Sequence, residues 1–227
     1  MSMIRFLGHS VFHVSATGLE GLVDPFLKGN DQACAVPGDF ESLTHLFVTH
    51  GHGDHLGDTV ELGLRTGATA VANAEICRFL SGKGLKTRPM YVGGWVPFPF
   101  GRVKFVPAVH GSGITEGKET FYGGVAVGIV LEIGGFRIYH AGDTGLTTEM
   151  GLLEVLEIDL ALLPIGGCYV MDIPDALRAV EMIRPKRVVP MHYNTFPGIE
   201  ADPQEFLSGL PGWVEGIRLE PGERFSF

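Results

Sequence analysis

The sequence has few cysteines and few basic residues, and it contains no long apolar run. Cys34, Cys77 and Cys168 are odd in number, far apart and without the spacing of a metal site. This usage argues against a disulfide framework and is typical of a reducing compartment. No run approaches the roughly 18 apolar residues of a membrane-spanning helix, and residues 1–6 lack the pattern of a secretory signal. We therefore expect a cytoplasmic protein that does not enter a membrane.

Basic side chains are outnumbered, because 17 Lys and Arg stand against 26 Asp and Glu, giving a net charge of −9. A sequence-independent grip on nucleic acid needs clustered Lys and Arg, so nucleic acid is not an expected partner. With 45% hydrophobic and 19% charged residues, the composition is that of a globular chain. We expect one domain over residues 1–227 and leave a homo-oligomer open.

Strand and helix patterns alternate along the chain without a linker or an obvious repeat. Short apolar or β-branched runs predict strands at 3–7, 11–15, 20–24, 44–49, 68–72, 86–92, 102–109, 124–133, 136–140, 159–163, 187–191, 214–219 and 224–227. Helices are predicted at 59–66, 74–81, 174–183 and after Asp202, with Asp172 and Asp202 as N-caps and residues 58–61 as a capping box. Many strands and few amphipathic helices favour an α/β fold with two sheets face to face and helices outside.

The segment Thr49-His50-Gly51-His52-Gly53-Asp54-His55 concentrates three imidazoles and one carboxylate in six positions. It follows a predicted strand and precedes a predicted helix, so we expect a tight loop whose glycines let the side chains converge. Neutral imidazoles are ready ligands for first-row metals, and carboxylates can bridge two ions. The segment therefore predicts a metal site, and more specifically a binuclear one.

Three further candidate ligands follow apolar runs. His110 follows residues 103–109, Asp143 comes three residues after His140, and His192 follows residues 188–191. The ends of strands gather functional loops in α/β folds, so each can bring a ligand toward residues 50–55. Five His and two Asp exceed what one ion uses, and a closed structural zinc site favours four Cys-rich ligands. We expect two divalent ions, zinc first, with Mn, Fe or Ni as alternatives.

Other short motifs span the chain. They are Leu7-Gly8-His9-Ser10, Val23-Asp24-Pro25-Phe26, Gly142-Asp143-Thr144, Leu163-Pro164-Ile165-Gly166-Gly167 and Pro190-Met191-His192-Tyr193-Asn194-Thr195-Phe196. With the His50-x-His52-x-Asp54-His55 loop, they make the chain resemble the metallo-β-lactamase superfamily. Within it, the resemblance is to uncharacterised metal-dependent hydrolases close to the ascorbate-6-phosphate lactonase-like branch. The resemblance implies a four-layer αββα sandwich with the site at one edge between the sheets.

The resemblance also implies how the ligands are shared. His50, His52 and His110 would hold one metal, Asp54, His55 and His192 the other, and Asp143 would bridge the two. Two cations lower the pKa of a shared water and so supply a hydroxide nucleophile at neutral pH. Asp54, which can also accept a hydrogen bond from that water, and His192 are the candidate catalytic residues.

The residues expected around the predicted metal ligands are less strongly indicated by the sequence. Asp24 is a candidate to hydrogen-bond a ligand imidazole, as carboxylates behind metal sites do. His9 either faces the site or is a structural turn residue, and His140 supports the loop of Asp143. One or more of Tyr193, Asn194 and Thr195, which follow His192, are expected to face substrate. Cys168 is expected to be a small buried thiol, with a position on the rim of the pocket as the alternative. The expected pocket walls are the loops 113–123 and 168–172, with Lys118, Tyr122 and Tyr169 as contacts.

The leading interpretation is hydrolysis of a small, anionic ester, lactone or phosphoester. A phosphodiesterase or nuclease is the alternative, although the acidic balance and the absence of a basic arm argue against it. A non-catalytic metal-binding regulatory protein conflicts with the complete ligand set. A di-iron protein that reduces oxygen or NO would place Glu in the signature loop and carry a flavin domain, and neither is found here.

Overall fold

The computed structural model describes residues 2–227, which divide into two compact units interleaved in sequence. Unit 1 contains the residues up to Val92 together with Gly111–Ala126 and Glu220–Phe227. Unit 2 contains Gly93–His110 and Val127–Leu219. Each unit is built on a seven-stranded sheet, and unit 1 also has a two-stranded hairpin.

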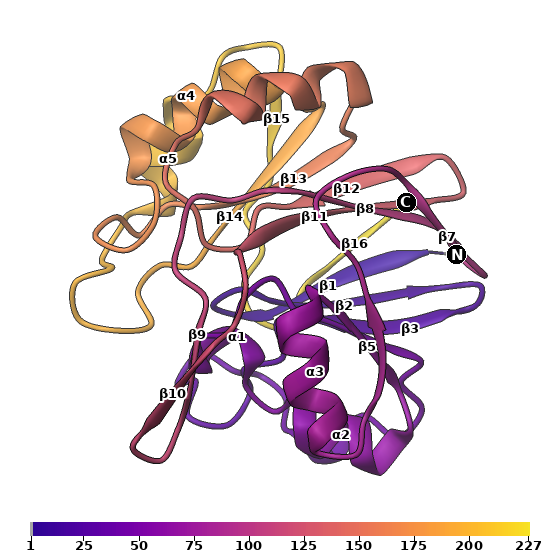
Figure 1. The fold of residues 1–227 in the computed structure, drawn as a ribbon. Coiled ribbons are helices and arrows are strands. Elements are labelled where there is room, and N and C mark those ends of the chain that lie inside the picture. Colours follow the sequence, from indigo (N-terminus) through magenta and orange to yellow (C-terminus); the bar gives the residue numbers. More distant parts are fainter. Residues whose placement is uncertain (1) are drawn as a thin grey trace. The chain divides into compact units, whose positions relative to one another are not determined.

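The sheet of unit 1 combines antiparallel and parallel strands. Its order is β16 (Arg224–Ser226), β1 (Met3–Gly8), β2 (Val11–Ala16), β3 (Leu19–Val23), β4 (His45–Phe47), β5 (Thr69–Ala72) and β6 (Lys86–Pro89). The strands from β3 to β6 are parallel, so their carboxyl ends meet at one edge. Helices α2 (Thr59–Thr66) and α3 (Ala74–Gly82) lie on one side of this sheet (Figure 1). The segments after β3 and β4 therefore begin next to each other.

Shorter elements complete unit 1. They are a 3-10 turn η1 (Pro37–Asp39), the one-turn helix α1 (Gly53–Leu56) and the antiparallel hairpin of β9 (Gly113–Glu116) and β10 (Glu119–Tyr122). Figure 1 shows the hairpin as a projecting pair of strands. The sequence predicted a loop at 113–123, and this prediction is wrong because the segment pairs with itself.

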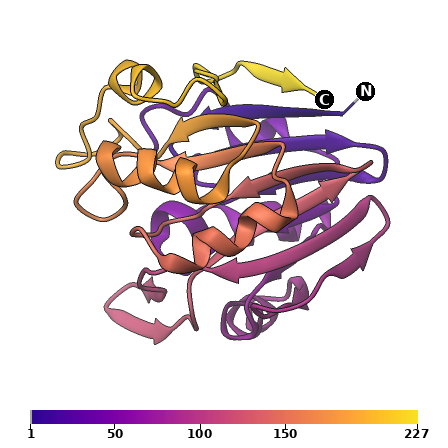
Figure 2. The same ribbon diagram turned by 90° about the horizontal axis from the view of Figure 1, so that it is seen from above.

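The sheet of unit 2 has the order β15 (Glu215–Gly216), β14 (Arg187–Met191), β13 (Leu160–Pro164), β12 (Phe136–His140), β11 (Val127–Ile133), β8 (Gly101–Pro107) and β7 (Val96–Phe98). The strands from β12 to β15 are parallel. The helices are η2 (Thr148–Leu156, a 3-10 helix), α4 (Ile173–Ile183) and α5 (Pro203–Ser208). Helices η2 and α4 lie side by side (Figure 2). None of the helices within residues 2–227 combines the length and the apolar character of a membrane span.

Local signals in the sequence predicted most elements well. The bounds of α2, β12 and β14 agree with prediction, and the carboxylates of Asp172 and Asp202 accept from the N–H groups of Asp175 and Gln204 as N-caps. The predicted capping box at 58–61 is wrong. Asp58 makes no side-chain cap, because its carboxylate accepts from the N–H groups of Leu27 and Lys28, both at 2.9 Å.

A charged cluster joins three adjacent strands of unit 2. Glu132 on β11 is opposite Arg102 on β8 and Arg137 on β12. Arg102 donates from Nε and Nη2 to the two Glu132 oxygens at 2.6 and 2.8 Å, and Arg137 Nε donates to Oε2 at 2.7 Å. These two guanidinium groups, Arg102 first, lower the pKa of Glu132 to about 2.

Because this pKa is depressed, the stability from Glu132 is present above the ordinary value of 4.5 and is lost as pH falls through about 2. We expect Glu132→Gln to reduce the free energy of unfolding at pH 7 by about 1 kcal/mol, since solvent screens the partly exposed guanidinium groups. The variant should also lose less stability than the wild type below pH 4.5. Urea unfolding between pH 7 and pH 2 checks this, with the exposed Glu181→Gln as the control. Equal losses for wild type and Glu132→Gln over the acid range would contradict it.

Candidate metal centre

The His/Asp segment begins just beyond β4 and runs into the one-turn helix α1. His52 is the N-cap residue of α1, so Asp54 and His55 lie on a helical turn and not on a loop as predicted. Gly51 permits a close approach to the hairpin side of unit 1. A Cβ on Gly51 would lie 2.6 Å from Ile114 Cγ1 and 2.7 Å from the Ser112 carbonyl oxygen. The spacing of the His and Asp residues therefore depends on a glycine at this position.

The fully buried carboxylate of Asp24 organises this segment. Asp24 follows β3 in the left-handed region, at φ 48°. Its Oδ1 accepts from the Thr49 N–H at 2.8 Å, and its Oδ2 accepts from the Thr49 hydroxyl at 2.7 Å. Oδ2 also lies 2.7 Å from His55 Nδ1. A carboxylate can only accept, so His55 Nδ1 carries the hydrogen and Nε2 is left with a lone pair.

Thr49 fixes the tautomer of His50 in the same way. The Thr49 hydroxyl uses its hydrogen on Asp24, and it lies 3.0 Å from His50 Nδ1, so that nitrogen is the donor. His50 therefore also presents Nε2 as a lone-pair atom, which lies 3.1 Å from His52 Nδ1. One buried carboxylate and one hydroxyl thus set the tautomers of two candidate ligands, the arrangement that supports metal-ligating histidines.

Asp54 is approached by two imidazoles. Its Oδ2 lies 3.3 Å from His9 Nε2 and 3.9 Å from His55 Nε2. The donor atoms of His9, Asp54 and His55 all lie within 4.8 Å of one another. His9, whose role the sequence left open between site and turn, thus belongs to this cluster.

Ser112 ties the segment to the hairpin side of unit 1. Its buried hydroxyl accepts from the Gly51 N–H at 3.1 Å and donates to the Gly123 carbonyl at 2.8 Å. Gly111, the residue directly after His110, lies against the His52 ring, since a Cβ there would be 3.4 Å from Cε1 and Nε2. Sequence reasoning missed Ser112 and Thr49. Their only signal is a hydroxyl residue within two positions of a candidate ligand.

Unit 2 carries the other candidate ligands as a second cluster. Asp143 Oδ2 lies 3.2 Å from His192 Nε2 and 3.5 Å from His110 Nε2. The buried Thr144 fixes the chain beside two of them, because its hydroxyl accepts from the Val109 N–H at 3.0 Å and donates to the Gly145 carbonyl. His192 is in the left-handed region at φ 54°. Such strain is concentrated at functional sites, where the surrounding structure holds it.

The outer candidates of unit 2 are placed differently from one another. His140 is buried, and its Nδ1 accepts from the Gly142 N–H at 3.1 Å, inside the turn that leads to Asp143. The Asn194 amide instead closes its own loop, donating to the Ala201 carbonyl and accepting from the Ala201 N–H. Asn194 also lines an open hollow of about 510 Å³ with Glu200, Ala201, Asp202, Pro203 and Arg218.

The expected wall residues are exposed. Tyr122 on β10 and Tyr169 are 75% and 59% exposed, and Lys118 lies in the turn of the hairpin. Cys168 is exposed as well, so the expectation of a buried thiol is wrong. Its backbone is left-handed at φ 56°.

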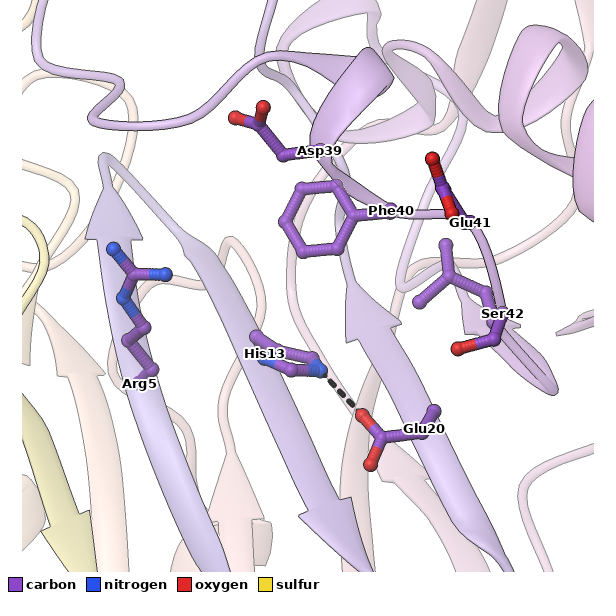
Figure 3. Close-up of a pocket in the computed structure, with 8 residues that line it drawn as sticks. Arg5, His13, Glu20, Asp39, Phe40, Glu41 and Ser42 are labelled. Atoms are coloured by element: carbon purple, nitrogen blue, oxygen red, sulfur yellow. Dashed lines mark hydrogen bonds and ion pairs between the residues drawn. The ribbon is translucent and has the colours of Figure 1, made fainter.

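Another hollow of unit 1 lies over the strands β1 to β3 and the segment after η1. It has a volume of about 200 Å³ and is lined by Arg5, His13, Glu20, Asp39, Phe40, Glu41, Ser42 and Leu43 (Figure 3). His13 Nε2 lies 2.8 Å from Glu20 Oε2. The lining contains no candidate ligand, so this hollow is separate from the metal chemistry.

The donor atoms of both clusters fit divalent ions. Two atoms bound to one ion at about 2.0–2.2 Å lie at most about 4.4 Å apart. The separation of 3.9 Å between Asp54 Oδ2 and His55 Nε2 in unit 1, and those of 3.2 and 3.5 Å in unit 2, meet this limit. Moreover, the His55 lone pair faces a carboxylate oxygen, a repulsive pair that a cation between them would stabilise. Imidazole and carboxylate donors suit Zn, Mn, Fe or Ni.

Comparison with known proteins assigns the class. A family model described as "Beta-lactamase superfamily domain" matches residues 21–193, so the chain belongs to the metallo-β-lactamase superfamily. Within it, the chain belongs to the metal-dependent hydrolases named "UPF0173 metal-dependent hydrolase". The relative from Carboxydothermus hydrogenoformans is 48% identical over 222 residues, 97% of either chain. That from Alkaliphilus metalliredigens is 48% identical over 204 residues, 89% of this chain and 90% of the relative.

A solved structure agrees with this assignment. Igni18, a metallo hydrolase from the hyperthermophilic archaeon Ignicoccus hospitalis, is 37% identical and superposes with a TM-score of 0.91 over 100% of this chain and 98% of its own. The family resemblance and the fold class predicted from the sequence are confirmed, and the chain is a metal-dependent hydrolase.

The contacts of Asp24 predict that this residue affects metal affinity. Asparagine has the same shape but only one oxygen, so Asp24→Asn cannot accept from Thr49 and His55 as the carboxylate does. We expect metal to bind about 10–100-fold more weakly and the free energy of unfolding to fall by about 1–3 kcal/mol.

Competition with a chromophoric chelator measures the affinity, and urea unfolding measures the stability. The exposed Asp31→Asn is the matched control and should change neither quantity. Wild-type affinity in Asp24→Asn would show that Asp24 does not set the orientation of the candidate ligands.

Proposed function

We propose that this chain hydrolyses a small, anionic ester, lactone or phosphoester at a binuclear metal centre. The ligand allocation is the one implied by the family's motif order. His50, His52 and His110 would hold one ion, Asp54, His55 and His192 would hold the other, and Asp143 would bridge the two. Zinc is the first choice of metal, and the proposal includes a cytoplasmic location.

The observation that best supports the proposal is the orientation of the histidines by Asp24. Through Asp24 and Thr49, both His50 and His55 present Nε2 with a lone pair. Histidines that only filled a core would not need a buried carboxylate in left-handed backbone to fix their tautomers. Keeping Asp24 buried and ionised is costly unless several donors satisfy it, and here they do.

Bound divalent ions would lower the pKa of a water molecule and polarise the substrate oxygen under attack. The chain's own residues would supply the rest. Asp54 offers carboxylate oxygens that can accept the proton from the attacking water. His192, buried at left-handed φ, is the second catalytic candidate, and Asp24, Thr49 and Ser112 hold the ligand loop in place.

The charge of the chain favours a small substrate over a polymer. A net charge of −9 repels nucleic acid at long range, whereas metal cations make their immediate surroundings positive. A compact phosphate or carboxylate can therefore be attracted at short range. The exposed Lys118, Tyr122 and Tyr169 are proposed substrate contacts.

We expect the purified protein to carry close to two metal ions per chain, because seven donors exceed the needs of one ion. His55→Ala should lose about one of the two, since Asp54 and His192 would be left with an incomplete set. Elemental analysis after metal-replete expression measures the content. His45→Ala, which changes a half-buried histidine of β4, should keep the wild-type content. One ion or none in the wild type would refute a binuclear centre.

Turnover should be efficient on small phosphoesters or lactones and weak on structured RNA and single-stranded DNA. Asp143→Ala should reduce hydrolysis to background while circular dichroism stays close to wild type, because the residue follows the strand β12 instead of forming its core. The assay compares both substrate groups under metal-replete conditions. Efficient nucleic-acid cleavage with little small-molecule turnover would favour a phosphodiesterase, and a fully active Asp143→Ala would show the ligand assignment to be wrong.

A further inference from the structure

His9 is buried and conformationally strained. It follows β1 at φ 58°, in the left-handed region that residues with a side chain seldom adopt. Its N–H donates to Gln32 Oε1 at 3.1 Å. The preceding Gly8 has φ 109°, and a Cβ there would lie 2.8 Å from the Gln32 carbonyl oxygen. The packing against residue 32 thus holds His9 in a strained backbone conformation. Without such support, a conformation of this kind costs about 1–3 kcal/mol.

The strained backbone directs the His9 ring toward the ligand cluster of unit 1. The ring makes edge contacts with Phe26 and His55, with centroids 5.8 and 5.6 Å apart. Its Nε2 lies 3.3 Å from Asp54 Oδ2. A histidine serving only as a turn residue would not need to bring its ring to this carboxylate.

The position of the hydrogen distinguishes His9 from His55. Because the carboxylate only accepts, the 3.3 Å contact is a hydrogen bond when His9 Nε2 carries the hydrogen. His55 cannot donate to Asp54 in this way, since its hydrogen is on Nδ1 and is directed at Asp24. Of the two imidazoles near Oδ2, His9 is therefore the donor and His55 the lone-pair atom.

We propose that His9 is a positioning residue that fixes the Asp54 carboxylate for metal binding, a role that rests on the proposed function. Asp54 stands on the single turn of α1 and its side chain is 27% exposed, whereas the side chain of His55, on the same turn, is fully buried. The hydrogen bond from His9 uses one lone pair of Oδ2 and selects one orientation of the carboxylate, which leaves the other carboxylate lone pairs available to the ion. Metal binding then avoids the entropic cost of ordering that side chain.

The test compares two variants that differ in hydrogen-bonding capacity. His9→Phe keeps an aromatic ring but removes the donor, and we expect Zn²⁺ to bind about 10–100-fold more weakly. His9→Gln keeps an N–H donor and should retain most of the affinity. Co²⁺-substituted His9→Gln should also show the visible spectrum of the wild type, because its ligand set is unchanged. His13→Phe, a half-buried histidine of β2 outside the cluster, is the control.

Equal losses in His9→Gln and His9→Phe, with an altered Co²⁺ spectrum, would overturn the proposal by making His9 a metal ligand. Wild-type affinity in His9→Phe would overturn it too. Nitrogen-15 NMR of the wild type, which needs no variant to fold, should show a hydrogen on His9 Nε2, and its absence would count against the proposal. All of these readouts are made without substrate, so a failed hydrolase assay would refute the proposed function and not the role of His9.

Discussion

The buried carboxylate of Asp24 connects two strand ends of unit 1 and the candidate ligands that follow them. It reaches the Thr49 backbone and hydroxyl beyond β4 and the His55 ring on α1. The parallel pairing of β3 and β4 makes this possible, because Val23 and Phe47 are in register and the chain leaves both strands at the same edge. If the carboxylate lost its donors, an unpaired charge would remain in the core, at a cost well above that of an ordinary hydrogen bond. Fold and ligand geometry therefore depend on the same contacts.

Backbone strain occurs beside these contacts in both units. His9, Asp24 and His192 all have φ near +50° without being glycine, and each immediately follows a strand. Asparagine or glycine would relieve the strain at such positions but would remove the imidazole or the carboxylate. The free-energy cost of these strained residues is offset by the preceding strands, because β1, β3 and β14 are largely buried and well paired. Stability in the sheets is thus used to hold polar groups in orientations that a relaxed turn would not give.

The sequence allowed most strands and the helices α2 to α5 to be predicted, because apolar runs and caps such as Asp172 and Asp202 act locally. The candidate ligands could be identified because their residue types are rare at that density. What could not be predicted depends on partners far along the chain. Asp58 has the spacing of a cap, yet it binds the backbone of residues 27 and 28. Ser112 and Gly51 are 61 residues apart in the sequence, and no local sequence pattern predicts the hydrogen bond between them. The hairpin of β9 and β10 was missed because each strand has only four residues and carries few apolar side chains.

Hydrogen bonds within each unit hold the candidate ligands in place, which distinguishes this centre from the closed zinc sites of small domains. In those small domains the free energy of metal binding drives folding, and the metal itself orders its ligands. Here Asp24, Thr49, Ser112 and Thr144 order them, so affinity reflects mainly the donors and little of the ordering cost. Imidazole and carboxylate donors alone discriminate weakly among divalent ions, whose affinities follow a general order. Selectivity for a substrate must then come from the surroundings. The β9–β10 hairpin of unit 1 and the segment around Tyr169 of unit 2 each carry exposed side chains that take no part in the buried contacts holding the ligands, and we propose these side chains as sources of that selectivity.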